Sequence, residues 1–249
     1  MSEVPGRVRA IVAPLLALVI AAAAAADATT LEIGAFSRQA AGGDPPAGWQ
    51  PLTFPGVARH TVYRLVADGG QTVLRADANA SASGLIRRVA VDPNAYPVLV
   101  WRWKVAAPVA AAAGTGRQSD DYAARVYVAF EYDPARVSAL NRAKYALNRF
   151  LYGEYPPHAG LSYVWASGLA PGTVMASPYS DRVRIIVVRS DGADAGRWLD
   201  ETRNVLADYR RAFGEEPPAI SGVAVMTDAD DTGTSATAWF GDIVLRRAP

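Results

Sequence analysis

Residues 98–105 read Val-Leu-Val-Trp-Arg-Trp-Lys-Val, and their alternation decides the fold class. Trp101 and Trp103 fall on one side of an extended chain, and Arg102 and Lys104 fall on the other. A period of two residues predicts a β-strand with one apolar and one polar face. The two tryptophans then either pack in a core or, if exposed, form a platform on which a sugar ring can stack.

Similar patterns surround this segment along most of the chain. Further strands are predicted within residues 31–36, 60–67, 72–78, 84–91, 123–132, 161–166, 183–190, 220–227 and 236–246. Two helices are predicted, from Asp133-Pro134 to Gly153 and from about Arg197 to Phe213. Because the strands do not alternate regularly with helices, we expect a mostly β protein, an antiparallel β-sandwich or jelly roll with two packed α-helices.

The first residues resemble a secretory signal peptide. Arg7 and Arg9 precede an uninterrupted apolar run over residues 10–26, and small residues stand before two alternative cleavage points, after Ala26 or after Ala28. The run is mostly alanine and is shorter than the roughly 20 apolar residues that a spanning helix needs. We therefore expect export, to the periplasm or outside the cell, with no stable membrane span after cleavage.

The expected organisation is a signal peptide at residues 1–26 and a single β-sandwich domain at residues 27–249. Of 25 basic and 24 acidic side chains, Arg7, Arg9 and Glu3 lie in the signal segment, so 23 of each remain. A neutral mature chain argues against nucleic acid as a partner. The absence of cysteine excludes a disulfide framework, and with only two histidines it argues against a zinc centre.

The segment Thr227–Gly233 reads Thr-Asp-Ala-Asp-Asp-Thr-Gly and concentrates carboxylates at a turn. Carboxylate oxygens are the ligands that calcium prefers, although the spacing is not that of an EF-hand loop. One hypothesis is a calcium site with the ligands Asp228, Asp230, Asp231 and Asp242. The alternative is a solvated hairpin turn in which the aspartates cap backbone amides.

Polar and aromatic side chains on the strands are candidates for binding a glycan or another polar small ligand. The predicted set is Arg102, Lys104, Asp120, Asp121, Arg125, Tyr127 and Trp165. If the strands within 98–105 and 123–132 are neighbours, their polar residues form one charged, concave face that includes Glu131. The alternative is a solvated sheet face with cross-strand ion pairs.

Several motifs together resemble one bacterial family. They are Trp101-Arg102-Trp103-Lys104, residues 120–128, Tyr163-Val164-Trp165-Ala166, Arg203-Asn204-Val205 with Asp208-Tyr209 and Phe213-Gly214, Met226–Thr232, and Gly241-Asp242-Ile243. In these motifs the chain resembles the domain-of-unknown-function family 3047 (DUF3047) over most of its mature length. The C-terminal part of the sequence, an acidic turn followed by a last strand with Asp242-Ile243, is also similar to that of galactose-binding-like jelly rolls, including carbohydrate-binding modules. The resemblance implies a fold and implies no activity.

Three functions compete on these observations. The first is an exported domain that binds a carbohydrate or a cell-envelope glycan, with aromatic rings stacked on the sugar and with Arg102, Asp121, Arg125 and Asp230 bonded to its hydroxyls. The second is a carboxylate-dependent glycan hydrolase or lyase, with its acid and base among Asp120, Asp121, Glu131 and Asp230. The third is a non-catalytic structural or assembly protein of the envelope that docks through the basic face of the first predicted helix.

Overall fold

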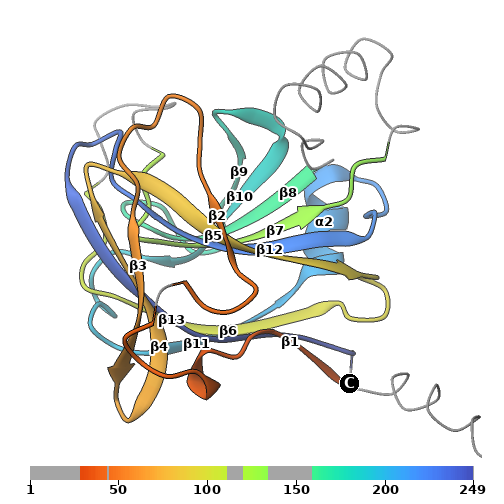
Figure 1. The fold of residues 1–249 in the computed structure, drawn as a ribbon. Helices are drawn as coiled ribbons and strands as arrows, with labels where there is room; N and C mark the ends of the chain where they lie inside the picture. Colours follow the sequence, from red (N-terminus) through yellow and green to blue (C-terminus); the bar gives the residue numbers. More distant parts are fainter. Residues whose placement is uncertain (1–28, 44, 111–119, 134–158, 249) are drawn as a thin grey trace, which may run out of the picture.

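The computed structural model describes residues 29–43, 45–110, 120–133 and 159–248, and thirteen strands lie in this part of the chain (Figure 1). Sheet A contains β1 (Thr30–Gly34), β3 (Val62–Asp68), β4 (Gln71–Asn79), β6 (Val98–Val105), β11 (Leu199–Asn204) and β13 (Ser235–Arg246). Sheet B contains β2 (Gln50–Leu52), β5 (Ala82–Val91), β7 (Ala124–Phe130), β8 (Ala159–Ala166), β9 (Val174–Ser177), β10 (Ser180–Ser190) and β12 (Ile220–Asp228).

The two sheets lie face to face and enclose one main hydrophobic core (Figure 1). Sheet A has the order β11-β6-β13-β4-β3, with β1 also paired to β13, and sheet B has the order β2-β5-β12-β7-β8-β10-β9. The pairs are antiparallel except for β8 with β10, which run parallel. The expected mostly β, antiparallel sandwich is therefore confirmed. The short edge strands β2 and β9 were not predicted, because three or four residues carry too little alternation.

Strand β6 confirms the alternation from which the fold class was predicted. Trp101 and Trp103 are fully buried between the sheets, so their interpretation as core residues is correct. The ring of Trp101 lies 5.5 Å from that of Tyr163, and the ring of Trp103 lies 5.9 Å from that of Trp165, measured between ring centres. Since the last two residues belong to β8, aromatic contacts of this kind join sheet A to sheet B.

The second predicted helix is correct only in its second half. Residues 199–204 form β11, which pairs with β6, and the helix α2 spans Val205–Phe213. Asn204 ends the strand and caps the helix, because its side chain accepts a hydrogen bond from the Ala207 N–H at 2.9 Å. The first predicted helix, residues 133–153, falls almost wholly outside the described residues. Within them, no helix has the length and apolar character needed to cross a membrane.

Residues 229–234 do not form a hairpin turn. They follow β12, which lies in sheet B, and precede β13, which lies in sheet A, so this acidic segment passes from one sheet to the other. The hairpin expectation is therefore wrong. Both strands have an apolar face directed at the core, but alternation alone does not reveal whether two such strands belong to the same sheet.

The strands within 98–105 and 123–132 are not neighbours, so the charged face that they would have shared is absent. Arg102 and Lys104 lie on β6 in sheet A, whereas Arg125 lies on β7 in sheet B. Because the two strands contribute their apolar faces to the same core, their polar faces point in opposite directions. Arg102 and Lys104 therefore lie on the opposite outer side of the sandwich from Arg125.

Candidate functional site

The structure places the predicted ligand residues in separate regions. Arg102 and Lys104 lie on the outer face of sheet A, and Tyr127 lies on the outer face of sheet B. Trp165 is buried in the core, where its indole N–H donates to the carbonyl of Asp191 at 3.0 Å. The other members gather where β7 begins and β12 ends.

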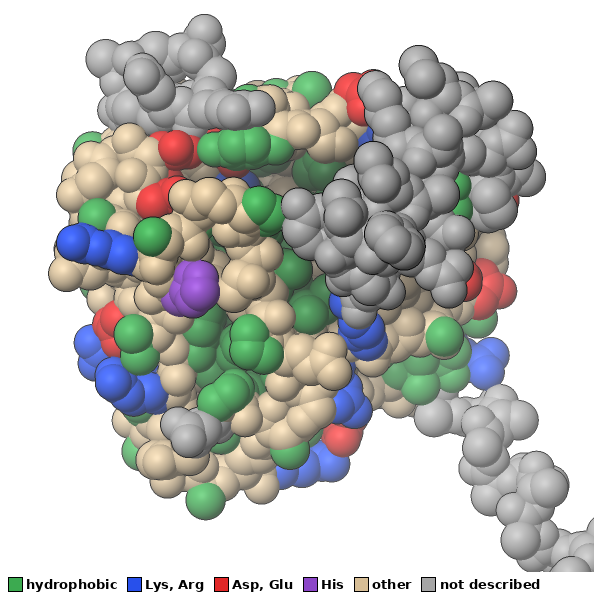
Figure 2. Space-filling model, turned by 45° about the horizontal axis from the view of Figure 1, so that its top comes forward, with side chains coloured by type: hydrophobic (Ala, Val, Ile, Leu, Met, Phe, Trp, Pro, Cys, Tyr) green, Lys and Arg blue, Asp and Glu red, His purple; other side chains and the backbone are tan. Residues whose placement is uncertain are grey.

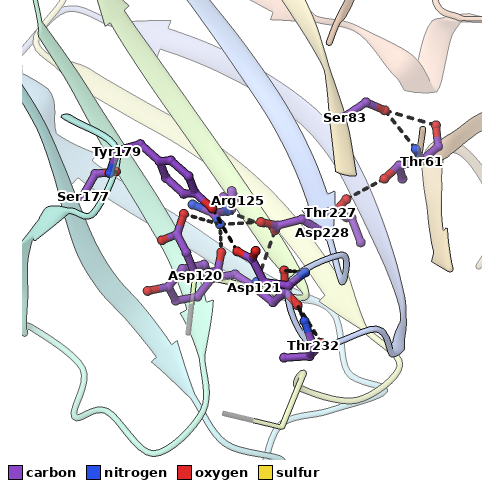
Figure 3. Close-up of polar contacts among 12 residues, drawn as sticks. Thr61, Ser83, Asp120, Asp121, Arg125, Ser177, Tyr179, Thr227, Asp228 and Thr232 are labelled. Atoms are coloured by element: carbon purple, nitrogen blue, oxygen red, sulfur yellow. Dashed lines mark hydrogen bonds and ion pairs between the residues drawn. The ribbon is translucent and has the colours of Figure 1, made fainter. Parts of the chain in front are cut away.

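We call this gathering the arginine–carboxylate cluster, formed by Asp120, Asp121, Arg125, Asp228, Asp230 and Asp231. Figure 3 shows Asp120, Asp121 and Asp228 around Arg125. The buried guanidinium of Arg125 donates from Nε to Oδ1 of Asp228 at 3.0 Å and from Nη2 to Oδ2 of the same carboxylate. Nη2 also donates to the carbonyl of Asp120 and lies 3.2 Å from its Oδ2. Arg125 therefore joins the start of β7 to the end of β12.

The carboxylates of this cluster outnumber its single guanidinium. Burial raises the pKa of Asp228 to about 7 against the opposing effect of Arg125, and repulsion from Asp120 and Asp121 adds to the rise. Burial likewise raises the pKa of Asp120, and its Oδ1 atom is buried without a hydrogen-bond partner among the described residues. The cluster therefore favours proton uptake at acidic pH.

Asp121, Asp230 and Asp231 are the described residues whose geometry could hold a metal ion. One carboxylate oxygen from each lies within 4.8 Å of the others, as a calcium site requires. However, Asp121 already accepts bonds from the Thr232 N–H at 2.7 Å and from the Thr232 hydroxyl at 2.6 Å, and Asp231 accepts one from the Tyr179 hydroxyl at 3.0 Å. Hydrogen bonds account for this arrangement, and the calcium hypothesis stays a prediction.

Asp228 and Asp242, two of the predicted metal ligands, form hydrogen bonds with residues outside the Asp121, Asp230 and Asp231 group. The carboxylate of Asp228 is bound by Arg125 and also accepts a bond from the Tyr122 N–H at 3.1 Å. Asp242 accepts bonds from the backbone N–H and the hydroxyl of Ser37, at 2.9 and 2.5 Å. Asp121, which does lie beside Asp230 and Asp231, was not predicted as a metal ligand. It was predicted to bind a glycan, because it lies far from the acidic segment in the sequence.

Tyr127 lies on an outer face that is largely apolar. Its cross-strand neighbour is Ser162 of β8, and Gly160 leaves the space for its ring, since an added Cβ would lie 1.9 Å from the phenol oxygen. Burial raises the pKa of Tyr127. Figure 2, in which the top of Figure 1 and with it sheet B comes forward, shows apolar side chains near the middle of this view as well as at its edges.

The outer face of sheet A carries a different arrangement, which we call the indole–cation surface and define by Arg75, Arg102, Lys104, Trp198 and Trp239. Trp239 lies directly opposite Lys104 on β6 and Arg75 on β4. The Nζ atom of Lys104 lies 4.5 Å from the ring centre of Trp239 and 5.1 Å from that of Trp198. The ammonium group thus contacts both indoles, which are partly exposed.

The hairpin between β3 and β4 completes this surface. Asp68 accepts a hydrogen bond from the Trp198 indole N–H at 2.8 Å and forms an ion pair with Lys104. The bond from Lys104 lowers the pKa of Asp68, so this carboxylate stays ionised and balances the charge of Lys104. The indole of Trp198 is consequently held in a fixed position above the sheet.

Two cations of this surface, Arg102 and Lys104, were predicted from the sequence, whereas Arg75 and the two aromatic rings were not. Trp198 appeared to belong to a helical stripe, although residues 199–204 alternate in burial along β11. Trp239 follows the acidic segment in the sequence, but its neighbours Lys104 and Arg75 come from other strands. Only the strand order reveals that these side chains meet.

Comparison with solved structures gives matches at low sequence identity, and no curated protein matches the chain. The family 11 carbohydrate-binding module of the cellulase Lic26A-Cel5E of Clostridium thermocellum has 10% identity and a TM-score of 0.44, covering 88% of this chain and 95% of that one. The family 30 module of Cel9D-Cel44B from the same organism has 12% identity and a TM-score of 0.39, covering 88% and 97%. Endoglucanase 3 of Trichoderma harzianum, from family GH12, has 10% identity and a TM-score of 0.39, covering 82% and 100%.

One family model matches the sequence over residues 47–244, which is most of the chain. The match includes the β6 motif, the arginine–carboxylate cluster and both tryptophans of the indole–cation surface. It confirms the resemblance that the motifs indicated. The chain belongs to the family described as "Protein of unknown function (DUF3047)".

Proposed function

We propose that this protein binds carbohydrate through the indole–cation surface on the outer face of sheet A. The observation that carries the proposal is the pair of partly exposed indoles, Trp198 and Trp239, arranged around one ammonium group. A sugar ring has an apolar face of C–H groups that packs on an aromatic ring, and hydroxyls at its edge that need polar partners. An indole pair bordered by charged side chains offers both kinds of contact.

The fixed position of the rings supports binding. Trp198 is held by its bond to Asp68 and by Arg102, whose guanidinium carbon lies 4.3 Å from the ring centre. Trp239 is held between Lys104 and the guanidinium of Arg75, at 4.5 and 5.5 Å. Rings that are already ordered lose little conformational freedom on contact with a ligand, which favours affinity.

Polar groups for sugar hydroxyls border the indoles. Gln71 lies beside Arg102, and Asp77 accepts bonds from Arg75 and from the Thr237 hydroxyl at 2.8 and 2.9 Å. These side chains combine donors and acceptors, as hydroxyl recognition requires.

The hydrolase or lyase alternative has weaker support. It needs two carboxylates that face a cleft with a cationic neighbour. In the arginine–carboxylate cluster a cation is present, but Asp228 is bound to it through both oxygens and Asp121 holds the Thr232 backbone. Both groups are thus engaged in bracing the fold, and we propose binding without catalysis.

Affinity electrophoresis through gels that contain cell-envelope or plant polysaccharides tests the proposal. At least one polymer is expected to retard the wild type, and the Trp198→Ala and Trp239→Ala variants are each expected to bind at least about tenfold more weakly, which corresponds to about 1.4 kcal/mol. Tyr179→Ala is the matched control, since Tyr179 is an exposed aromatic residue at the other cluster.

The control is expected to bind like the wild type, and far-UV circular dichroism should show that all variants are folded. Retardation by none of the polymers would remove the proposed function. Unchanged retardation of both tryptophan variants would move the binding site away from the indole–cation surface.

A further inference from the structure

We infer that the glycan bound by the indole–cation surface is acidic, and that Arg102 is the residue that contacts its acid group. This inference rests on the proposed function and adds the ligand class. It comes from Arg102, which differs from the other cations on this surface because it forms no ion pair with a carboxylate of the described residues.

The other two cations each have a carboxylate partner. Lys104 forms an ion pair with Asp68, and Arg75 forms one with Asp77 at 2.8 Å. The only hydrogen bond of Arg102 within the described residues goes from Nη1 to the side-chain oxygen of Gln71 at 3.3 Å. Its Nε atom is buried and has no hydrogen-bond partner in this part of the chain.

The nearest acids do not neutralise Arg102. Asp200 lies opposite it on β11, but this carboxylate is exposed and forms no ion pair with it in the described structure. Asp68 is close enough for Arg102 to stabilise the charge of this carboxylate. However, the Oδ2 atom of Asp68 already accepts hydrogen bonds from Lys104 and from the indole N–H of Trp198. Arg102 therefore leaves a positive charge on the surface without a partner of its own.

The guanidinium is also held in place before any ligand arrives. Its aliphatic stem lies over Gly241 at the irregular part of β13, where an added Cβ would come within 2.4 Å of Cγ and 2.7 Å of Cδ. Its planar end contacts the ring of Trp198. Glycine below and indole beside it thus define where the charged group lies.

Such a group suits a carboxylate or a sulfate. A guanidinium offers several N–H donors in one plane, and two of them can bond the two oxygens of one anion. An acidic glycan could therefore stack a sugar ring on the indoles and direct its acid group to Arg102. A neutral glycan would leave this charge without a partner.

The test uses matched pairs of polymers. Polygalacturonate and hyaluronate are compared with their carboxyl-reduced forms, and dextran sulfate with dextran, by titration calorimetry at constant ionic strength near 0.15 M, because salt screens charge. The wild type is expected to bind an acidic polymer at least about tenfold more tightly than its neutral counterpart. The two acidic chemistries in the panel show whether carboxylate or sulfate is preferred.

Variants of Arg102 test whether this residue causes the preference for acidic polymers. Arg102→Gln is expected to reduce the preference to within about twofold, and Arg102→Lys to retain only part of it, because lysine keeps the charge and loses the planar pair of donors. Arg64→Gln is the control: it removes an equal charge from an exposed position opposite Arg75 on the same sheet. It should keep the full preference.

The outcomes separate this inference from the proposed function. Equal binding of acidic and neutral polymers, or an acid preference that Arg102→Gln leaves intact, would overturn the inference and leave carbohydrate binding standing. Binding to no polymer would remove both. Equally tight binding of single-stranded oligothymidylate would also overturn it, since the charge would then attract any polyanion.

Discussion

At the residue scale, the buried guanidinium of Arg125 contacts the carboxylates of Asp120 and Asp228, and Asp121 lies near enough to repel the latter. One cation does not balance three acids that are largely removed from water. Asp228 therefore holds its proton at a pH where an exposed aspartate has lost it. This difference couples the stability of the fold to pH.

The sign of that coupling follows from the raised pKa. Between an unfolded-state pKa of 3.8 and a folded-state pKa of about 7, the folded protein binds a proton on Asp228 that the unfolded chain releases. The free energy of unfolding is thus expected to fall as pH rises from about 4 to about 7, by at most about 1.4 kcal/mol per pH unit for this group. Urea denaturation across this range measures it.

An Asp228→Asn variant isolates the contribution of this carboxyl. Asparagine has nearly the same shape but does not titrate, so its free energy of unfolding should vary less with pH than that of the wild type. The raised pKa values of Asp120 and Asp230 act in the same direction and remain in the variant. A wild-type stability that increases with pH over this range would contradict the interpretation.

Gly241 provides a second prediction at this scale. In Gly241→Ala the new methyl group would meet the flexible side chain of Arg102, so we expect the arginine to move and the strand to stay. Stability should change by less than about 1.5 kcal/mol, whereas the preference for acidic polymers should fall several-fold. Loss of the fold, seen in urea denaturation, would show that the close contact at Gly241 is not relieved in this way.

At the element scale, Asn204 joins β11 to α2 by ending the strand and capping the helix. Asn204→Ala is expected to reduce the free energy of unfolding by about 1 kcal/mol, because the Ala207 N–H loses its acceptor. The change is measured by urea denaturation beside Thr202→Ala, an exposed strand position. If both variants lose the same stability, the cap is not the cause.

This element also shows what can be predicted from the sequence and what cannot. The apolar spacing correctly predicted the helix end at Phe213, where Gly214 adopts the left-handed conformation that closes the last turn. The start was wrong because Trp198 and Thr202 happen to fit a helical period, while the pairing of β11 with β6 is a long-range contact that no local pattern contains. Because of this error, Trp198 was not recognised as a residue on the surface of sheet A.

At the scale of the whole molecule, alternation predicted the inner and outer faces of β6 correctly, and the assignment of strands to sheets decided the rest. Arg102 and Arg125 would share one face only if their strands were neighbours, and they lie on opposite sheets. The acidic segment before β13 was expected to form a hairpin and instead connects the sheets. Both candidate sites are built from segments far apart in the chain, so their composition depends on topology that the sequence pattern does not encode.

Carbohydrate binding at the indole–cation surface requires that a glycan contacts Trp198 and Trp239. Titration of the ¹⁵N-labelled protein with a polysaccharide that retards it, observed through the indole N–H resonances of its six tryptophans, tests this claim most directly. The resonances of Trp198 and Trp239 are expected to shift, and those of Trp101, Trp103 and Trp165, which lie in the core, are expected to stay. Saturable binding with both surface resonances unmoved would show that the glycan binds elsewhere on the protein.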